Sequence, residues 1–149
     1  MRTAYLDTSA IIKRYIEEKG SDEVRKVFER ALAGGIYVAF SAWNIGEAIV
    51  VFNKYLNRGY ISEKEYETVK RLFISELIRF AKLRLLRLVP VKTEIIISSI
   101  PLAEKYKLYI ADTIQITSAK RVNSSEFYTA DRKLHEAALS ENLNSIYLG

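Results

Sequence analysis

Four carboxylates in this sequence lie where secondary-structure elements are expected to meet. Asp7 and Asp131 each follow a short β-prone segment, while Asp112 and Glu47 each lie in the first turns of an expected helix. Carboxylates gathered in a low-dielectric pocket would repel one another strongly, so they would take up protons or bind divalent cations. Oxygen ligands suit Mg²⁺ or Mn²⁺, and such ions can clamp a phosphodiester, activate an attacking water and stabilise the leaving oxygen.

The composition means that any metal ion must be held mainly by oxygen ligands. The 149 residues include no cysteine and one histidine, His135, which excludes disulfides, thiolate metal sites and sites built from several imidazoles. The formal charge of +5 favours a polyanionic partner. The N-terminal residues reach Asp7 before any apolar run long enough for a signal peptide, and no stretch is long enough to span a membrane, so we expect a cytoplasmic protein.

The hydrophobic pattern predicts strands separated by helices, in a single domain over residues 1–149. Strands are expected at 3–6, 36–40, 85–91, 126–129 and 145–148. Pro90 indicates that the third of these strands ends there or lies at an edge of the sheet. Helices are expected from Asp7-Thr8-Ser9 through Tyr15, over 22–33, from Ser41 to about 56, from Ser62 to about 83, from Thr93 to about 105, around Asp112 to about 121, and over 132–141. Strands separated by helices imply parallel pairing with right-handed crossovers, and therefore a layered α/β sheet covered on both faces.

The two helices near the middle of the chain are expected to form a hairpin. Ser41 is the expected cap of the first helix, Ser62 with Glu65 forms a capping box for the second, and Thr93 is the expected cap of the next helix along the chain. Residues expected to face inward from the second helix are Val69, Leu72, Phe73, Leu77 and Phe80.

The hairpin carries more apolar residues than one core stripe needs. The surplus residues are Val50, Val51, Tyr55, Ile74 and Ile78. This surplus suggests a homodimer, the alternative being tighter packing within the hairpin.

The expected topology brings the four acids towards one edge of the sheet. Ligands of open parallel sheets collect at the carboxyl ends of the strands, where Asp7 and Asp131 are expected. The amide hydrogens and dipole of a helix N-terminus favour an anion at Asp112. Glu47 is followed by apolar residues, so its carboxylate is expected to point towards packed protein, where it would need a partner.

Each acid also has a purely structural interpretation. Asp7, Asp112 and Asp131 are good helix-cap or first-turn residues, and Glu47 could be a helix-surface acid paired with a basic residue farther along its helix. Only the occurrence of all four acids in one topology points to catalysis.

The order and spacing of these motifs resembles the PIN-domain family and, within it, the VapC toxins of toxin–antitoxin pairs. The resemblance rests on YLDTSA at 5–10, the segment from Ser41 to Glu47 that opens a helix, the Ala111-Asp112 pair that opens another, and TADRKL at 129–134. It covers essentially the whole chain. It implies a three-layer α/β sandwich with a short parallel central sheet, flanking helices and a helical hairpin near the middle of the chain.

The resemblance also implies Mg²⁺- or Mn²⁺-dependent hydrolysis of RNA. Carried over position by position, it makes the four acids metal ligands and assigns Ser9 and Thr129 as hydroxyls that position water or metal. The family's fourth acid, here Asp131, often acts through water. The implied catalytic set is Asp7, Ser9, Glu47, Asp112, Thr129 and Asp131.

A toxin of this kind implies two macromolecular contacts. A small antitoxin should cover the acidic pocket, with an arginine or lysine against the carboxylates. The RNA backbone could contact basic residues near the motifs, namely Lys13, Arg14, Arg132 and Lys133. Trp43 and the ten tyrosines could stack on unpaired bases, although packing in the core or an interface is the simpler use.

Other functions are compatible with parts of the pattern. A PIN nuclease in RNA processing, or a catalytically silent PIN module that binds RNA or protein, fits the same resemblance. A phosphatase of the haloacid-dehalogenase kind would need a second acid where Ser9 stands, and a phosphate-receiver domain would need adjacent acids after its first strand.

Overall fold

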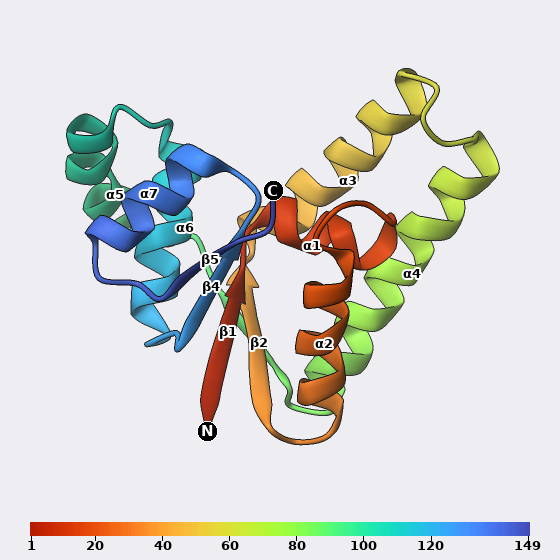
Figure 1. Ribbon diagram of the computed structural model, residues 1–149, viewed down its shortest axis with the longest axis horizontal. Helices are drawn as coiled ribbons and strands as arrows, with labels where there is room; N and C mark the ends of the chain where they lie inside the picture. Colours follow the sequence, from red (N-terminus) through yellow and green to blue (C-terminus); the bar gives the residue numbers. More distant parts are fainter.

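The five strands form one parallel sheet with the order β3-β2-β1-β4-β5 (Figure 1). The computed structural model describes residues 1–149. Its strands are β1 (Arg2–Leu6), β2 (Ile36–Ser41), β3 (Leu86–Val89), β4 (Glu126–Thr129) and β5 (Ser145–Tyr147). Parallel pairing follows because a helix separates each strand from the next, as the sequence predicts.

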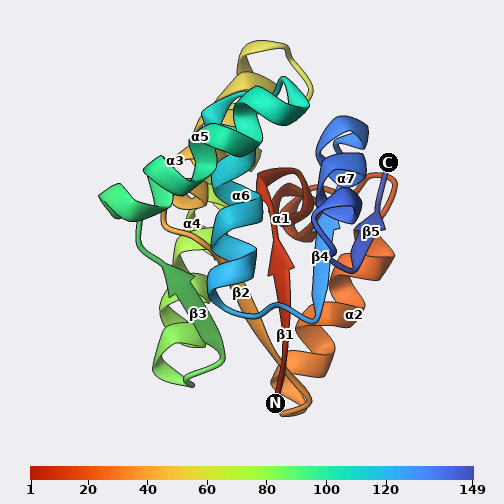
Figure 2. The same cartoon turned by 90° about the vertical axis from the view of Figure 1, so that its left-hand side faces the viewer.

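Helices cover both faces of the sheet, giving the expected three-layer sandwich (Figures 1 and 2). One face carries α1 (Thr8–Tyr15), α2 (Ser21–Leu32), α3 (Trp43–Asn57) and α4 (Glu63–Lys82), and the other carries α5 (Thr93–Tyr106), α6 (Ile110–Arg121) and α7 (Arg132–Ser140). Successive side chains of β1 point to opposite faces of the sheet, so the core has two parts. Ala4 and Leu6 face the first helical layer, while Tyr5 faces the second.

Helices α3 and α4 form the predicted hairpin, which extends beyond the sheet in Figure 1. Phe52 of α3 and Phe73 of α4 pack edge to face, with ring centroids 6.2 Å apart. Gly59 has a φ of 76°, a left-handed conformation that favours glycine, and it lies immediately after the α3 cap. The hairpin is therefore anchored by aromatic packing near the sheet and turned at a glycine.

The predicted capping box at the start of α4 is present. The Ser62 side chain accepts a hydrogen bond from the Glu65 amide at 3.1 Å, and the Glu65 carboxylate accepts one from the Ser62 amide at 3.0 Å. We expect Ser62→Ala to lower the free energy of unfolding by about 1 kcal/mol, because it leaves an amide of the first turn without its partner. Urea unfolding measures this loss. Ser75→Ala, within the same helix, is the control, and an equal loss from both variants would contradict the capping role.

Three local predictions are wrong in detail. Ser41 is the last residue of β2 and Ala42 precedes α3, although the Ser41 hydroxyl still accepts a hydrogen bond from the Trp43 amide at 3.1 Å. Thr93 is the first residue of α5 rather than its cap, because the chain becomes helical one residue earlier than predicted. Leu72 is 49% exposed, since the inward stripe of α4 runs through Val69, Phe73 and Phe80.

Strand β3 lies at the edge of the sheet, as Pro90 indicated. It ends at Val89, earlier than the predicted limit, because proline has no amide hydrogen for the ladder.

None of the helices is both long enough and apolar enough to cross a membrane.

Candidate active site

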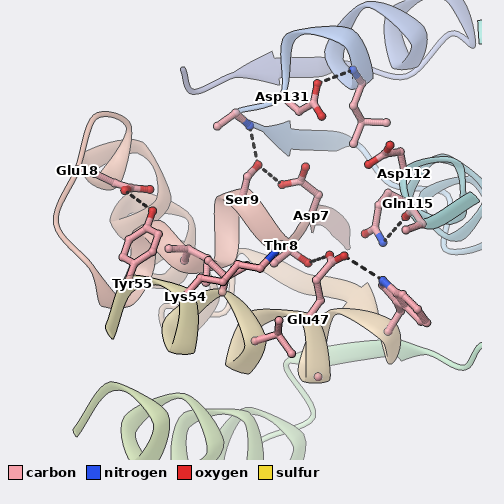
Figure 3. Close-up of a pocket in the computed structure, with 18 residues that line it drawn as sticks. Asp7, Thr8, Ser9, Glu18, Glu47, Lys54, Tyr55, Asp112, Gln115 and Asp131 are labelled. Atoms are coloured by element: carbon pink, nitrogen blue, oxygen red, sulfur yellow. Dashed lines mark hydrogen bonds between the residues drawn. The ribbon is translucent and has the colours of Figure 1, made fainter. Parts of the chain in front are cut away.

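A cleft of about 790 Å³ lies beside the carboxyl ends of β1 and β4, and all four predicted acids line it (Figure 3). Asp7 follows β1, Asp131 lies two residues beyond β4, Glu47 projects from α3, and Asp112 lies in the first turn of α6. The parallel topology thus brings together residues that are distant in the sequence, at the edge where such sheets bind ligands.

Asp7 is the most deeply buried of the four acids, with 5% of its surface exposed. Its Oδ1 accepts hydrogen bonds from the Ala10 amide at 2.9 Å and the Ser9 hydroxyl at 2.6 Å, and its Oδ2 accepts one from the Thr129 hydroxyl at 2.5 Å. The bond to Ala10 caps α1. Asp7 therefore caps α1, as the structural interpretation expects, and it also lines the cleft, as a functional role would require.

The two predicted hydroxyls, Ser9 and Thr129, join α1 to the end of β4. Ser9 Oγ accepts a hydrogen bond from the Ala130 amide at 2.8 Å, and Thr129 Oγ1 accepts one from the Asp131 amide at 3.0 Å. Each hydroxyl donates to Asp7 as well. They hold the Asp7 carboxylate in one orientation between two chain segments.

Removing the Thr129 hydroxyl is expected to change the acidity of Asp7. Thr129→Val deletes a hydrogen bond to the charged carboxylate, so we expect the midpoint of the Asp7 titration to rise by about one pH unit. Carbon NMR of the Asp7 carboxyl measures this midpoint directly. Thr129→Ser retains the hydroxyl and should titrate like the wild type, and an unchanged midpoint in Thr129→Val would contradict the assignment.

Glu47 is half-buried and lines the cleft, which corrects the prediction that it points into packed protein. The apolar residues after it on α3, Val50 and Val51, line the same cleft instead of enclosing the carboxylate. Its Oε1 accepts a short hydrogen bond from the Thr8 hydroxyl, and its Oε2 accepts one from Trp43 Nε1 at 3.2 Å.

Buried Asn44 supports the Thr8–Glu47 contact from behind. Its Nδ2 donates to Thr8 Oγ1 at 2.7 Å, and its Oδ1 accepts from the Ser41 amide at 2.7 Å. The end of β2, the start of α3 and the start of α1 are joined by this chain of hydrogen bonds. Glu47 is consequently held along the wall of the cleft.

Asp112 and Asp131 complete the acidic lining from the opposite layer. Asp112 is half-buried, while Asp131 is exposed at the start of α7. Asp131 Oδ1 accepts a hydrogen bond from the Leu134 amide at 3.2 Å and so caps α7. Its second oxygen leaves a charge at the mouth of the cleft.

Two of the acids, Asp7 and Asp112, have raised pKa values. Burial, with a smaller contribution from the charge of Asp131, raises the pKa of Asp7 to about 6, against the hydrogen bonds from Ser9, Thr129 and Ala10. Burial also raises the pKa of Asp112, and the charges of Asp131 and Glu47 act in the same direction. The cleft therefore disfavours full ionisation unless a cation compensates the charge.

The donor set fits Mg²⁺ or Mn²⁺, because it consists of carboxylate and hydroxyl oxygens. Five carboxylates line the cleft, those of Asp7, Glu18, Glu47, Asp112 and Asp131. No three acidic, histidine or cysteine side chains already form a metal-binding group. Asp7, Glu47 and Asp131 each also accept hydrogen bonds from the chain.

Two of the predicted RNA-contacting basic residues have structural partners instead. Lys13 is buried and pairs with Glu18 at 3.1 Å, and Arg14 pairs with Glu76 at 2.9 Å. His135 packs against Tyr147 and forms a hydrogen bond with Ser145 at 2.8 Å, so its contacts are structural.

Sequence reasoning missed three residues around the acids. One of them, Lys54, shares the α3 face of Glu47 at an interval of seven residues, a signal that was available in the sequence. Trp43, named from the sequence as a residue that could stack on bases, lies on the same face four residues before Glu47. Thr8 and Asn44 were not identifiable in this way, because their contacts depend on how α1 and α3 meet.

Comparisons with known proteins agree with this architecture. The family model of the PIN domain matches residues 4–139. No curated protein sequence matches the chain.

Solved structures of other proteins share the fold of this chain. A FitAB complex bound to a DNA fragment has 18% identity over 97% of this chain and 94% of that chain, with a TM-score of 0.66. The VapC20 toxin of Mycobacterium tuberculosis, which cleaves the sarcin–ricin loop, has 12% identity over 90% and 94%, with a TM-score of 0.61. A toxin–antitoxin complex from Klebsiella pneumoniae has 19% identity over 98% and 98%, with a TM-score of 0.61. Together with the family match over most of its length, this fold means that the chain belongs to the PIN-domain family.

Proposed function

We propose that this chain is a Mg²⁺- or Mn²⁺-dependent endoribonuclease and the toxin of a toxin–antitoxin pair. The observation that carries the proposal is the set of four carboxylates in one cleft, with buried Asp7 at a pKa of about 6. Such a set is costly to keep charged without a cation, and a cation held there can act on a phosphodiester.

The residues of the chain have separate roles in this proposal. A divalent cation, when bound, would polarise the phosphodiester and lower the pKa of a water molecule. Asp7 and Asp112 are the principal ligands, since both carboxylates are withdrawn from solvent and perturbed by their neighbours. Glu47 would join them from the α3 side of the cleft, and Asp131 acts from the mouth of the cleft, through water.

The hydroxyls of Ser9 and Thr129 hold the Asp7 carboxylate, a principal ligand, in place. Ser9 and Thr129 each contact Asp7 and the end of β4, so they hold the Asp7 carboxylate in one orientation. This pre-organisation avoids reorienting the main ligand during each turnover.

The toxin assignment rests on the relatives rather than on the cleft. Among the proteins that share the fold, one is a toxin and another is a toxin–antitoxin complex. We infer an antitoxin that covers the cleft and places an arginine or lysine against its carboxylates. An RNA-processing nuclease would have the same cleft and differ in lacking such a partner.

A homodimer is part of the same proposal. Leu72 is 49% exposed, Ile74 38% and Ile78 48%, which leaves apolar side chains of the hairpin in contact with solvent. Light scattering of the purified protein should give twice the mass of one chain, and a monomer at high concentration would contradict the dimer.

Cleavage of labelled RNA by purified protein tests the proposed function. We expect cleavage in Mn²⁺ or Mg²⁺ and none in EDTA. Equal cleavage in EDTA would contradict metal dependence. Stable RNA binding with no cleavage of diverse RNAs in either metal would favour the silent module, which also keeps the fold.

A further inference from the structure

The face of α3 that lines the cleft carries an aromatic ring and a cation on opposite sides of Glu47. Trp43, Glu47, Val50 and Lys54 all line the cleft, and their spacing of three or four residues places them on one helix face. Trp43 and Lys54 are separated by about 16 Å along the axis of α3, from the usual helical rise. The wall thus presents a ring, a carboxylate and an ammonium group in that order.

Trp43 is a large apolar side chain that the fold leaves 46% exposed. Its indole N–H donates to Glu47 Oε2 at 3.2 Å, which fixes the edge of the ring beside the acid. The ring is in none of the aromatic pairs or cation–π contacts of the chain. An oriented ring of this kind can stack on any unpaired base, because every base has a π-face.

Lys54 supplies the positive charge of the same wall. Helical side chains lean towards the N-terminus of their helix, and Lys54 extends along the cleft towards Thr8 and Glu47 (Figure 3). Lys13 and Arg14 are neutralised by Glu18 and Glu76, whereas Lys54 is in no ion pair. It is also the only lysine or arginine that lines the cleft.

We propose that the α3 wall is a subsite for an unpaired RNA strand, in which one base stacks on Trp43 and a backbone phosphate binds Lys54. The subsite rests on the proposed nuclease function, since the strand passes Glu47 between these two residues. A duplex does not fit this role, because its bases are stacked on one another and offer no free face to a side chain.

Trp43 is the only tryptophan in the sequence, so tryptophan fluorescence reports on this ring alone. The protein is titrated in Ca²⁺ with an unpaired RNA oligonucleotide and with an abasic oligomer of equal length, which has the phosphates without the bases. The RNA is checked for integrity afterwards. We expect saturable quenching by the RNA and none by the abasic oligomer.

Three variants separate the base contact from the phosphate contact. Anisotropy of the labelled oligomers should show that Trp43→Ala weakens RNA binding by about tenfold and leaves the abasic oligomer unaffected, while Trp43→Phe stays close to the wild type. Lys54→Met should weaken both oligomers alike and reduce the slope of log affinity against log salt by about one.

Tyr60→Ala and Lys64→Met are matched controls, because both residues are exposed at the tip of the hairpin, outside the cleft lining. Circular dichroism melts establish that each variant is folded. Both controls should bind RNA like the wild type.

Several results would overturn the subsite. The first is that Trp43→Ala binds RNA with wild-type affinity. The second is that this variant loses affinity equally for the RNA and the abasic oligomer. The third is that it changes self-association without a change in RNA binding. Failure of the wild-type protein to bind unpaired RNA would also overturn it, even if RNA is cleaved. If the variants show the expected binding pattern but no RNA is cleaved in any divalent metal, the subsite is supported and the proposed nuclease function is contradicted.

Discussion

Asp7→Asn is expected to lower RNA cleavage by about a thousandfold, because loss of a metal-binding carboxylate removes several kcal/mol of transition-state stabilisation. Asparagine has the same shape, so its oxygen can still cap α1 through the Ala10 amide. The Thr129 hydroxyl can rotate to accept from the new amide group. The variant should therefore fold, and its defect should lie in cleavage.

The assay compares initial rates of cleavage of one labelled RNA at saturating Mn²⁺. Asp22→Asn is the control, because Asp22 is an exposed acid of α2 that pairs with Arg25, away from the cleft. The control should cleave at the wild-type rate. If Asp7→Asn retains wild-type activity, Asp7 is not a ligand of the catalytic metal.

The same substitution is expected to stabilise the metal-free protein by about 3 kcal/mol near neutral pH. Burial raises the pKa of Asp7 from 3.8 to about 6, so the folded protein holds this proton more tightly than the unfolded chain does. Stability contributed by this group is therefore lost as the pH rises from about 4 to above 6. Each pH unit between the two pKa values corresponds to about 1.4 kcal/mol.

Urea unfolding in EDTA at a series of pH values measures this effect as a difference between the wild type and Asp7→Asn. The difference should be largest above pH 7 and should vanish below about pH 3, where Asp7 is protonated in both states. Other acids, such as Glu141, whose pKa is lowered by Lys120, contribute equally to both proteins. A difference that does not depend on pH would show that Asp7 titrates normally.

Mn²⁺ should remove most of the difference in stability between the two proteins. A bound cation compensates the Asp7 charge and stabilises the wild type by about 2.7 kcal/mol at a hundredfold excess over its dissociation constant. Asp7→Asn should gain little. Equal stabilisation of both proteins would place the bound metal elsewhere.

Much of the fold follows from the sequence because its signals are local. Ser62 and Glu65 are three residues apart and form the capping box wherever the hairpin packs. Pro90 excludes a longer β3 by its own chemistry. Leu72 was placed wrongly because its exposure depends on the angle at which α4 crosses the sheet.

The candidate site is only partly predictable for the same reason. Asp7 and Asp131 follow strands, so topology alone brings them to one edge. The position of Glu47 depends on its contacts with Thr8 and Trp43, and Asn44 supports them only because α1 lies against α3. Such contacts join residues about 36 positions apart, and no local pattern encodes them.

Calorimetric titration of Mn²⁺ into the purified protein tests most directly whether the acidic cleft is a metal site. We expect saturable binding that tightens as the pH rises through the pKa of Asp7, about 6, because the metal and the proton compete for the same carboxylate. Binding should be lost in Asp7→Asn. Absence of binding to the wild type, or equal affinity in Asp7→Asn, would contradict the central claim.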